Sequence, residues 1–354
     1  MIANTLRGRY RDVALFHVRM SFSRQLREGG RLHPRKIGHL LAVIVKIVIA
    51  RARTKATTLY YPPSGPGGAP MYRDMAILLA TRWMFSTTVF HHHAGGVSDA
   101  YATLPWAAKP LYRKAFFRPD VGIRTSPLAP PDPARLYARH DVVVLNGVED
   151  AAAATPADAF AARTAGTPTI LFVGLLTESK GVFVLLDACA ELKRRSVSFR
   201  VELVGEFQSE QTRADVEQRV RRTGLEEIVQ ARGVLVGAAK HRAYAAAAVL
   251  AFPTFFESET FGLVLIEAMQ FSLPVVATSW RGIPAVVEDG ANGFLVPVGD
   301  SSALADRLAQ LVTDRALAER LGRRGRKTYE ERFTLDRFHR DMQAVFDTIG
   351  AEAR

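Results

Sequence analysis

The chain has 354 residues, of which 48% are hydrophobic and 23% charged, so it is neither a disordered nor a fibrous protein. Its length exceeds the size at which one hydrophobic core keeps growing, and two domains are therefore expected. With a single cysteine, Cys189, the chain can form neither a disulfide framework nor a thiolate metal site, which fits a reducing compartment. Cys189 itself is interpreted as a small hydrophobic residue in a helix core.

The formal net charge of +12 is unevenly distributed along the sequence. Residues 1–165 contain 23 Lys and Arg against 10 Asp and Glu, a net of +13, whereas residues 166–354 contain 24 against 25, a net of −1. A basic half can bind nucleic acid or an anionic membrane leaflet, and it can also reflect a genome that uses arginine for solubility. No P-loop, zinc-finger spacing or nucleic-acid module is found, so nucleic acid is not expected as a partner.

The N-terminal sequence carries no targeting or membrane-spanning pattern. Charged residues interrupt residues 1–23 too often for a secretory signal. The longest apolar run, residues 40–50, includes Lys46 and is well short of the roughly 20 residues that a membrane span requires. The protein is therefore expected to stay in the cytoplasm.

In the first half, apolar segments predict alternating strands and helices. Strands are expected at 12–18, 57–63, 87–93 and 141–147, and helices at 36–50 and 71–85. Residues 42–50 are rich in β-branched side chains, yet they are assigned to a helix because the strand at 57–63 fits better. This half, residues 1–150, is predicted to be a Rossmann-like domain.

Residues 151–168 are rich in Ala, Thr and Pro without an apolar period, which predicts an interdomain linker. From 169 to 334 the alternation is regular and predicts a second doubly wound domain with a parallel sheet. Its strands are expected at 169–174, 199–205, 227–233, 249–254, 274–279 and 293–298, with helices at 182–195, 210–223, 240–248 and from 262. A final helix, 335–354, has one apolar face and is expected to pack back on the first domain.

In open α/β sheets, ligands bind beyond the carboxyl ends of the strands. Lys180 and Gly181 follow the strand at 169–174 at a helix start, where an anion such as phosphate is favoured. Glu259 lies in the loop after the strand at 249–254, Gly262 opens the next helix, and Glu267 falls in its second turn, where it can accept hydrogen bonds from ribose hydroxyls. A structural salt bridge explains Glu267 alone equally well, but it does not explain the whole set.

Two segments, "FVGLLTESKG" (172–181) and "ESETFGLVLIEAMQFSLPVVAT" (257–278), resemble the C-terminal domain of retaining glycosyltransferases of family 4. The family signature, two glutamates separated by seven residues, is matched by Glu259 and Glu267, and the similarity covers residues 141–333. The resemblance implies the GT-B fold, in which two Rossmann-like domains face a cleft. It also implies transfer of a sugar, with retained anomeric configuration, from a UDP- or GDP-linked donor to a glycan or lipid-linked acceptor in surface polysaccharide or glycolipid assembly.

The resemblance also implies roles for individual residues. Glu267 should bind the ribose, Glu259 the hydroxyls of the transferred sugar, and Lys180 should neutralise the leaving diphosphate. The backbone at Phe261 and Gly262 should lie against sugar and diphosphate. Further donor-binding positions are expected at Thr260, Gly181, Gly174 and Gly205. The sequence contains no Asp-x-Asp pair, so neither a metal nor a cofactor is expected.

Two positions depart from the family pattern. The arginine that the family usually has five residues before the lysine is replaced by Leu175, and the glutamate after the Gly-x-Pro turn is replaced by Ala285. Phosphate binding would then be weaker, or Arg281 or another arginine would take over.

The segment "TTVFHHHAGG" (87–96) resembles an acceptor-side loop of the family, in which a histidine at a strand end faces the donor sugar. Strand alternation places His91 and His93 on one face and His92 on the other, so His91 and His93 are the candidate catalytic residues of this half. A metal site is the alternative, but further ligands are not found nearby.

The family's chain opens with a strand and a Gly-Gly loop, whereas residues 9–23 already resemble its second strand region, and Gly29 and Gly30 come too late. The interpretation is that the sequence starts late or is truncated, so that the first domain lacks its first strand and helix.

Residues 105–118 place four aromatic residues among four basic ones, a composition typical of membrane interfaces. They are Trp106, Tyr112, Phe116 and Phe117, with Lys109, Arg113, Lys114 and Arg118. Peripheral contact with an anionic membrane, the inner face of the plasma membrane, is expected. The alternative is that these aromatics pack against the sheet.

Two other functions remain open at this point: a sugar-nucleotide epimerase of the same fold, which needs no acceptor, and an inactive glycosyltransferase-like scaffold.

Overall fold

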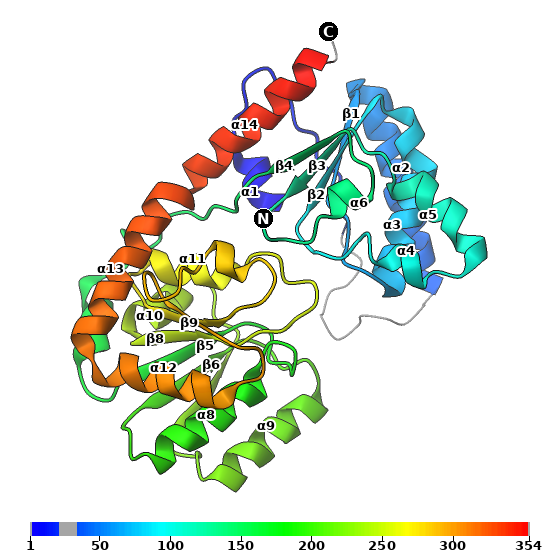
Figure 1. Ribbon diagram of the computed structural model, residues 1–354. Helices are drawn as coiled ribbons and strands as arrows, with labels where there is room; N and C mark the ends of the chain where they lie inside the picture. Colours follow the sequence, from blue (N-terminus) through cyan, green and yellow to red (C-terminus); the bar gives the residue numbers. More distant parts are fainter. Residues whose placement is uncertain (1, 21–33, 353–354) are drawn as a thin grey trace. The chain divides into compact units, whose positions relative to one another are not determined.

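The computed structural model describes residues 2–20 and 34–352, and contacts between them divide the chain into two units (Figure 1). Unit 1 comprises residues 1–146 and 336–354, and unit 2 comprises residues 147–335. Gly29 and Gly30 lie outside the described residues. Each unit contains its own parallel sheet flanked by helices, so the predicted α/β class with two Rossmann-like units is confirmed.

Unit 1 contains a four-stranded parallel sheet in the order β1-β2-β3-β4. Its strands are β1 (Thr58–Tyr61), β2 (Thr87–His92), β3 (Val121–Arg124) and β4 (His140–Val143). Because successive right-handed crossovers move across the sheet in one direction, they place their helices on the same face. That face is covered by α2 (Pro34–Thr54), α3 (Gly68–Thr81) and α5 (Lys109–Phe116). The core between these helices and the sheet includes Ile77, Phe90 and Tyr112.

The other side of this sheet carries α1 (Ile2–Arg7) and the final helix, α14 (Leu335–Glu352) (Figure 1). The apolar face of α14 is buried as its sequence pattern predicts, with Phe338 and Met342 both nearly inaccessible. Three short helical turns complete the loops of unit 1. They are α4 (Ala100–Thr103), η3 (Trp106–Ala108) and α6 (Asp132–Arg135), and η2 (Arg82–Met84) extends α3.

The strand predicted at 12–18 is wrong, because these residues form an irregular segment. A strand needs a neighbour with which to exchange backbone hydrogen bonds, and β1 pairs with β2 alone in the sheet. The chain just before this segment contacts α14 instead. The ring of Tyr10 packs edge-on against Phe346 at 4.9 Å, and the Arg11 amide donates to Gln343 Oε1 at 2.7 Å.

Unit 2 contains a six-stranded parallel sheet in the order β10-β9-β8-β5-β6-β7. Its strands are β5 (Thr169–Val173), β6 (Arg200–Val204), β7 (Val229–Gly233), β8 (Val249–Phe252), β9 (Val275–Thr278) and β10 (Phe294–Val296), and all six lie within predicted segments. Strands β5 and β8 are neighbours although they are far apart in the sequence. The order of the strands therefore reverses there, and a crevice for a ligand is expected outside their carboxyl ends.

Helices cover both faces of the second sheet. They are α8 (Val182–Arg194), α9 (Glu210–Thr223), α10 (Gly237–Ala246), α11 (Leu263–Gln270), α12 (Ser301–Thr313) and α13 (Arg315–Arg332). Helix α8 packs against α12, and the buried Cys189 lies in this core as a small hydrophobic residue. A short turn, η5 (Ile283–Ala285), follows β9.

Residues 151–168 belong to unit 2 in the structure and are not a free linker. They include α7 (Ala157–Ala161) and η4 (Ala162–Thr164), and Arg163 fixes them in place. Its guanidinium donates to four backbone carbonyls at the C-terminal ends of α10 and α11: Tyr244, Ala245, Phe271 and Ser272. Burial lowers the pKa of Arg163 to about 10. The sequence of residues 151–168 has no apolar period, and it therefore gave no sign that Arg163 would hold this segment by hydrogen bonds to backbone carbonyls.

Candidate functional site

Two loops at the reversal point of the second sheet form the candidate site. One follows β5 and leads into α8, and the other follows β8 and leads into α11. They are hydrogen-bonded to each other, since the Phe255 amide and the Thr254 hydroxyl both donate to Ser179 O, at 2.8 and 3.3 Å. Gly174 and Gly205 lie beside this edge, directly after β5 and β6, and their amides donate to Val204 O and Gly233 O.

Glycine is required where these loops touch. Gly181 has a φ of 81°, and a Cβ on it would lie 2.1 Å from the carbonyl oxygen of Pro253. Gly262 has a φ of 77° and lies against the Phe252 ring. Both residues immediately precede a helix, so the free amides of α8 and α11 are presented at the same edge of the sheet. Such helix ends favour a negatively charged ligand.

Lys180 and Glu259 form an ion pair across the two loops. The Nζ–Oε2 distance is 2.7 Å, and the side chains are 20% and 12% exposed. Oε1 of Glu259 accepts a hydrogen bond from the Gly262 amide at 3.1 Å, and Lys180 Nζ lies 4.5 Å from the centre of the Phe256 ring. These contacts offset the cost of partly burying both charges. An ammonium has three donors and a carboxylate about four acceptor sites, so each group keeps capacity for a ligand.

Thr260 and Phe261 follow Glu259 and are buried, at 4% and 1% exposure. Phe261 packs edge-on against Phe333 at 5.6 Å. The side chains of both residues are therefore largely enclosed by the protein.

Glu267 lies in α11 with both carboxylate oxygens occupied. Lys240 Nζ is 2.8 Å from Oε1 and 2.7 Å from Oε2, and the Tyr244 hydroxyl donates to Oε2 at 2.8 Å. The Tyr244 ring is buried and stacks on Phe271. Burial, followed by the charge of Glu267, raises the pKa of Tyr244 well above its ordinary value, so its hydroxyl remains a donor. The salt bridge considered for Glu267 is thus present, while 22% of the carboxylate side chain remains exposed.

The partners Lys240 and Tyr244 were missed at the level of sequence. Both lie on α10, four residues apart and thus on one face of the helix. The predicted helix at 240–248 already contained this pair, and a cation and a phenol at i and i+4 were the signal that could have identified it.

In unit 1, the candidate histidines follow the predicted alternation. The rings of His91 and His93 stack with centroids 4.0 Å apart, so both side chains lie on one face. The Tyr60 hydroxyl lies 2.5 Å from His91 Nδ1. Burial lowers the pKa of His91 well below its ordinary value and that of His93 to about 3, so both rings are neutral near neutral pH.

Across residues 2–20 and 34–352, no three His, Cys, Asp or Glu side chains come together as metal ligands.

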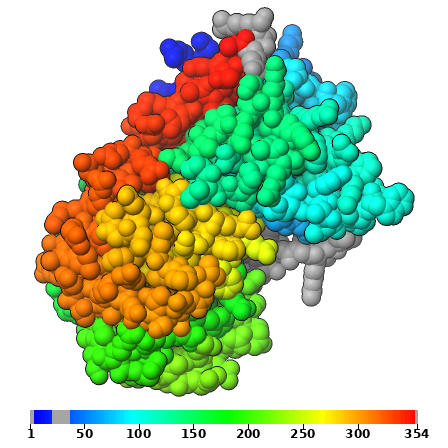
Figure 2. All heavy atoms as spheres, viewed as in Figure 1, coloured from blue at the N-terminus to red at the C-terminus, as the bar shows by residue number. Residues whose placement is uncertain are grey.

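The basic aromatic segment at 105–118 divides into exposed and buried residues. Tyr112 and Phe116 are buried against the sheet of unit 1, at 0% and 1% exposure, as the alternative interpretation has it. Trp106 is 85% exposed. The segment is carried by η3 and α5, and the cyan part of unit 1 that includes them is seen at the surface in Figure 2. In the helices that the structure describes, no stretch is both long and apolar enough to cross a bilayer.

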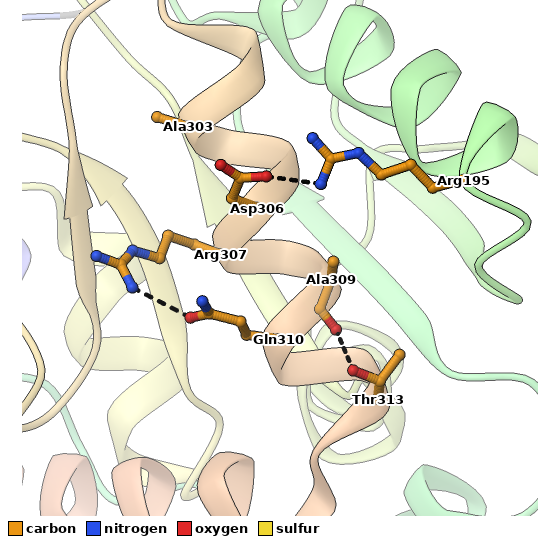
Figure 3. A pocket seen from close by; sticks show the side chains of 7 residues that line it. All are labelled: Arg195, Ala303, Asp306, Arg307, Ala309, Gln310 and Thr313. Atoms are coloured by element: carbon orange, nitrogen blue, oxygen red, sulfur yellow. Dashed lines mark hydrogen bonds and ion pairs between the residues drawn. The ribbon is translucent and has the colours of Figure 1, made fainter.

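A surface hollow in unit 2 lies outside the candidate site (Figure 3). It is lined by α12 and by Arg195 after α8, on the side where the chain leaves α8 for the start of β6. Its charged and polar side chains bind one another, with Arg195 2.6 Å from Asp306 and Arg307 3.1 Å from Gln310. This hollow is therefore not assigned to the reaction.

The chain is similar to known proteins in sequence and in fold. Residues 167–314 match the family described as "Glycosyl transferases group 1". A phosphatidyl-myo-inositol mannosyltransferase of Mycobacterium leprae is 38% identical over 165 residues, 45% of this chain and 42% of that protein. A putative colanic acid biosynthesis glycosyltransferase, WcaL of Salmonella typhimurium, is 30% identical over 185 residues, 51% and 45% of the two chains. The chain thus spans about half the length of these curated relatives.

Solved structures match over most of the chain. Sucrose-phosphate synthase from Thermosynechococcus elongatus superposes with a TM-score of 0.73 at 22% identity, covering 91% of this chain and 81% of its own. Anabaena HepE, solved in complex with UDP and glucose, superposes with a TM-score of 0.69 at 21% identity, covering 88% and 82%. At these identities the likeness shows the fold, which is GT-B. Together, these matches confirm the predicted family resemblance and fold class.

Proposed function

We propose that this chain, whose residues 167–314 match the group 1 glycosyltransferases, transfers a sugar from a nucleotide diphosphate sugar to an acceptor hydroxyl with retained configuration. The observation that carries the proposal is that the Lys180–Glu259 ion pair and Glu267, which is paired with Lys240, are carried by the loops and helix at the point where the strand order of the second sheet reverses. Surface polysaccharide or glycolipid assembly is the proposed context, because the relatives are named as enzymes of such pathways.

Each group of the cluster has a proposed task. Glu267 accepts hydrogen bonds from the ribose hydroxyls, and the amides at the starts of α8 and α11 bind the diphosphate. Lys180 counters the negative charge that grows on the diphosphate as the bond to the sugar breaks, which stabilises the transition state without a metal. Glu259 accepts hydrogen bonds from the transferred sugar and holds the Lys180 ammonium in position at 2.7 Å.

In unit 1, the neutral imidazoles of His91 and His93 are assigned to hydrogen bonds with sugar hydroxyls. A neutral ring has one donor and one acceptor nitrogen. The Tyr60 hydroxyl at Nδ1 of His91 orients that ring, while Nε2 is closed off from solvent and has no hydrogen-bond partner among the described residues.

The proposal is tested by product analysis. Purified protein is incubated with UDP- and GDP-linked sugars, with and without hydroxyl acceptors such as inositol phosphates and short mannosides. We expect release of nucleoside diphosphate only with acceptor, and a product whose anomeric proton coupling matches that of the donor. Conversion of the donor to its epimer without acceptor would establish the epimerase instead. Binding of donors without turnover of any acceptor would favour the inactive scaffold.

Membrane contact is proposed for a different surface from the one expected at 105–118. Helix α2 exposes five aliphatic side chains, each between 42% and 58% accessible: Ile37, Leu41, Val45, Val48 and Ile49. At 3.6 residues per turn, they fall within an arc of roughly 120°. Lys46 and Arg53, both exposed, border this arc. An apolar arc with basic residues beside it fits the interface of an anionic membrane, and the net charge of +13 on residues 1–165 adds to the attraction.

We expect the protein to sediment with vesicles that contain anionic lipid and to be released by high salt. Leu41→Glu combined with Val45→Glu should reduce the bound fraction at least tenfold, because both charges would enter the apolar layer. Trp106→Ala, which alters an exposed aromatic residue outside α2, is the matched control and should have a smaller effect. Equal binding of the double variant and the wild type would contradict the assignment, as would a concentration-dependent dimer that covers α2.

A further inference from the structure

Arg281 lies in the loop after β9 with an unusual backbone, and its guanidinium carbon lies 5.3 Å from the centre of the Trp280 ring. Its φ of 45° is in the left-handed region, which non-glycine residues seldom adopt because it is strained. Among the residues that the structure describes, no acceptor binds any nitrogen of its guanidinium, and its Nε is closed off from solvent. The other half-buried arginines of unit 2 differ: Arg163 donates to four carbonyls, and Arg326 pairs with Asp150.

This state calls for an explanation, because a buried donor without an acceptor is unfavourable. A guanidinium is always charged and presents its donors in a planar fork that suits phosphate and carboxylate oxygens. The missing acceptor is therefore expected to be an anion that binds there.

The loop of Arg281 is fixed against the loop that carries Glu259. The Trp280 indole donates to Phe256 O at 2.9 Å. On the other side, Gly282 lies so close to the Thr260 carbonyl that a Cβ would be 1.8 Å from its oxygen. The Phe256 ring in turn lies 4.5 Å from Lys180 Nζ. Arg281 is thus held between two contacts to the candidate site.

We propose that Arg281 binds the diphosphate of the nucleotide donor as a second cation beside Lys180. Lys180 is already paired with Glu259, and Leu175, directly after β5, contributes no charge. The left-handed backbone of Arg281 persists because Trp280 and Gly282 are anchored on either side of it. This inference rests on the proposed function, since it assigns a new residue to the same donor site.

Arg281→Gly is the variant of choice because glycine adopts a φ of 45° without strain. Removal of the side chain should leave the melting temperature unchanged or raise it, so a loss of binding cannot be attributed to unfolding. Calorimetric titration with UDP, GDP and inorganic pyrophosphate should show a loss of affinity of about 10- to 100-fold, the range for a hydrogen bond to a charged group. Affinity for the corresponding nucleoside should be unchanged. Arg195→Gln, in the hollow outside the site, is the matched control and should bind like the wild type.

The outcomes separate this inference from the proposed function. If the wild type binds nucleoside diphosphate and Arg281→Gly binds it equally well, the role of Arg281 is overturned and the donor site stands. If the wild type binds neither nucleoside diphosphate nor pyrophosphate, both are overturned. If Arg281→Gly loses affinity for diphosphate and nucleoside alike, Arg281 supports the whole loop and does not bind phosphate.

Discussion

Lys180→Ala is expected to lower kcat for sugar transfer about 100- to 1000-fold while raising the Kd of the donor much less. The reason is that negative charge on the diphosphate grows as the bond to the sugar breaks, so Lys180 interacts more strongly with the transition state than with the bound donor. Removal of one such charge-stabilising group typically costs about 2.7–4 kcal/mol of activation free energy. Steady-state kinetics with saturating donor, together with direct titration of the donor, separate kcat from binding.

The ion pair with Glu259 requires a control, because loss of Lys180 leaves a carboxylate of 12% exposure without its partner. The double variant Lys180→Met with Glu259→Gln removes both charges at similar volume. If Lys180 served stability alone, this variant would recover the melting temperature, since neutral side chains of matched shape often replace an ion pair without loss, and its kcat would equal that of Glu259→Gln alone. We expect the melting temperature to recover and kcat to lie well below that of Glu259→Gln. Equal kcat in these two variants would contradict a role of Lys180 in the reaction.

The second sheet was predictable because its strands are buried on both faces. Strands of parallel sheets read as continuous apolar runs, and β5, β8 and β9 are each almost fully buried. Apolar runs do not identify the strands of unit 1 equally well. Residues 12–18 have an apolar pattern but no neighbouring strand, and β3 (Val121–Arg124) was missed because its four residues include Gly122 and follow Pro119. Whether a segment finds a partner strand is a property of the fold and not of its own sequence.

The candidate site was also predictable only in part. The spacing of Glu259 and Glu267 and the position of Lys180 after a strand sufficed to locate the loops at the reversal point. The sequence could not show that each glutamate is held by a lysine, because Lys180 and Lys240 lie 79 and 27 residues away from their partners. A carboxylate among apolar neighbours thus has a paired cation, so the salt bridge considered for Glu267 is confirmed. With 22% of its side chain exposed, binding of ribose by Glu267 stays a prediction.

Glu267→Ala is expected to weaken binding of the nucleoside diphosphate at least 100-fold. Two hydrogen bonds from ribose hydroxyls to a carboxylate are lost, each worth about 1.5–3 kcal/mol. The variant also leaves the buried hydroxyl of Tyr244 without its acceptor, which should lower the free energy of unfolding by about 1–3 kcal/mol. Titration calorimetry on folded protein, with thermal unfolding followed in parallel, measures the two effects separately.

Two comparisons decide whether Glu267→Ala weakens nucleotide binding because it loses contacts to the ribose or because it disturbs the fold. Tyr244→Phe keeps the ring stacked on Phe271 and removes the hydroxyl alone, so it should lower the melting temperature while binding changes only a few-fold. The 2′-deoxy nucleotide should bind the wild type more weakly than the ribonucleotide, because one hydroxyl is missing. Glu267→Ala should no longer distinguish the two ligands, since the group that reads the hydroxyls is gone. Equal discrimination by variant and wild type would show that the ribose is bound elsewhere, and Glu267 would then serve only the ion pair with Lys240.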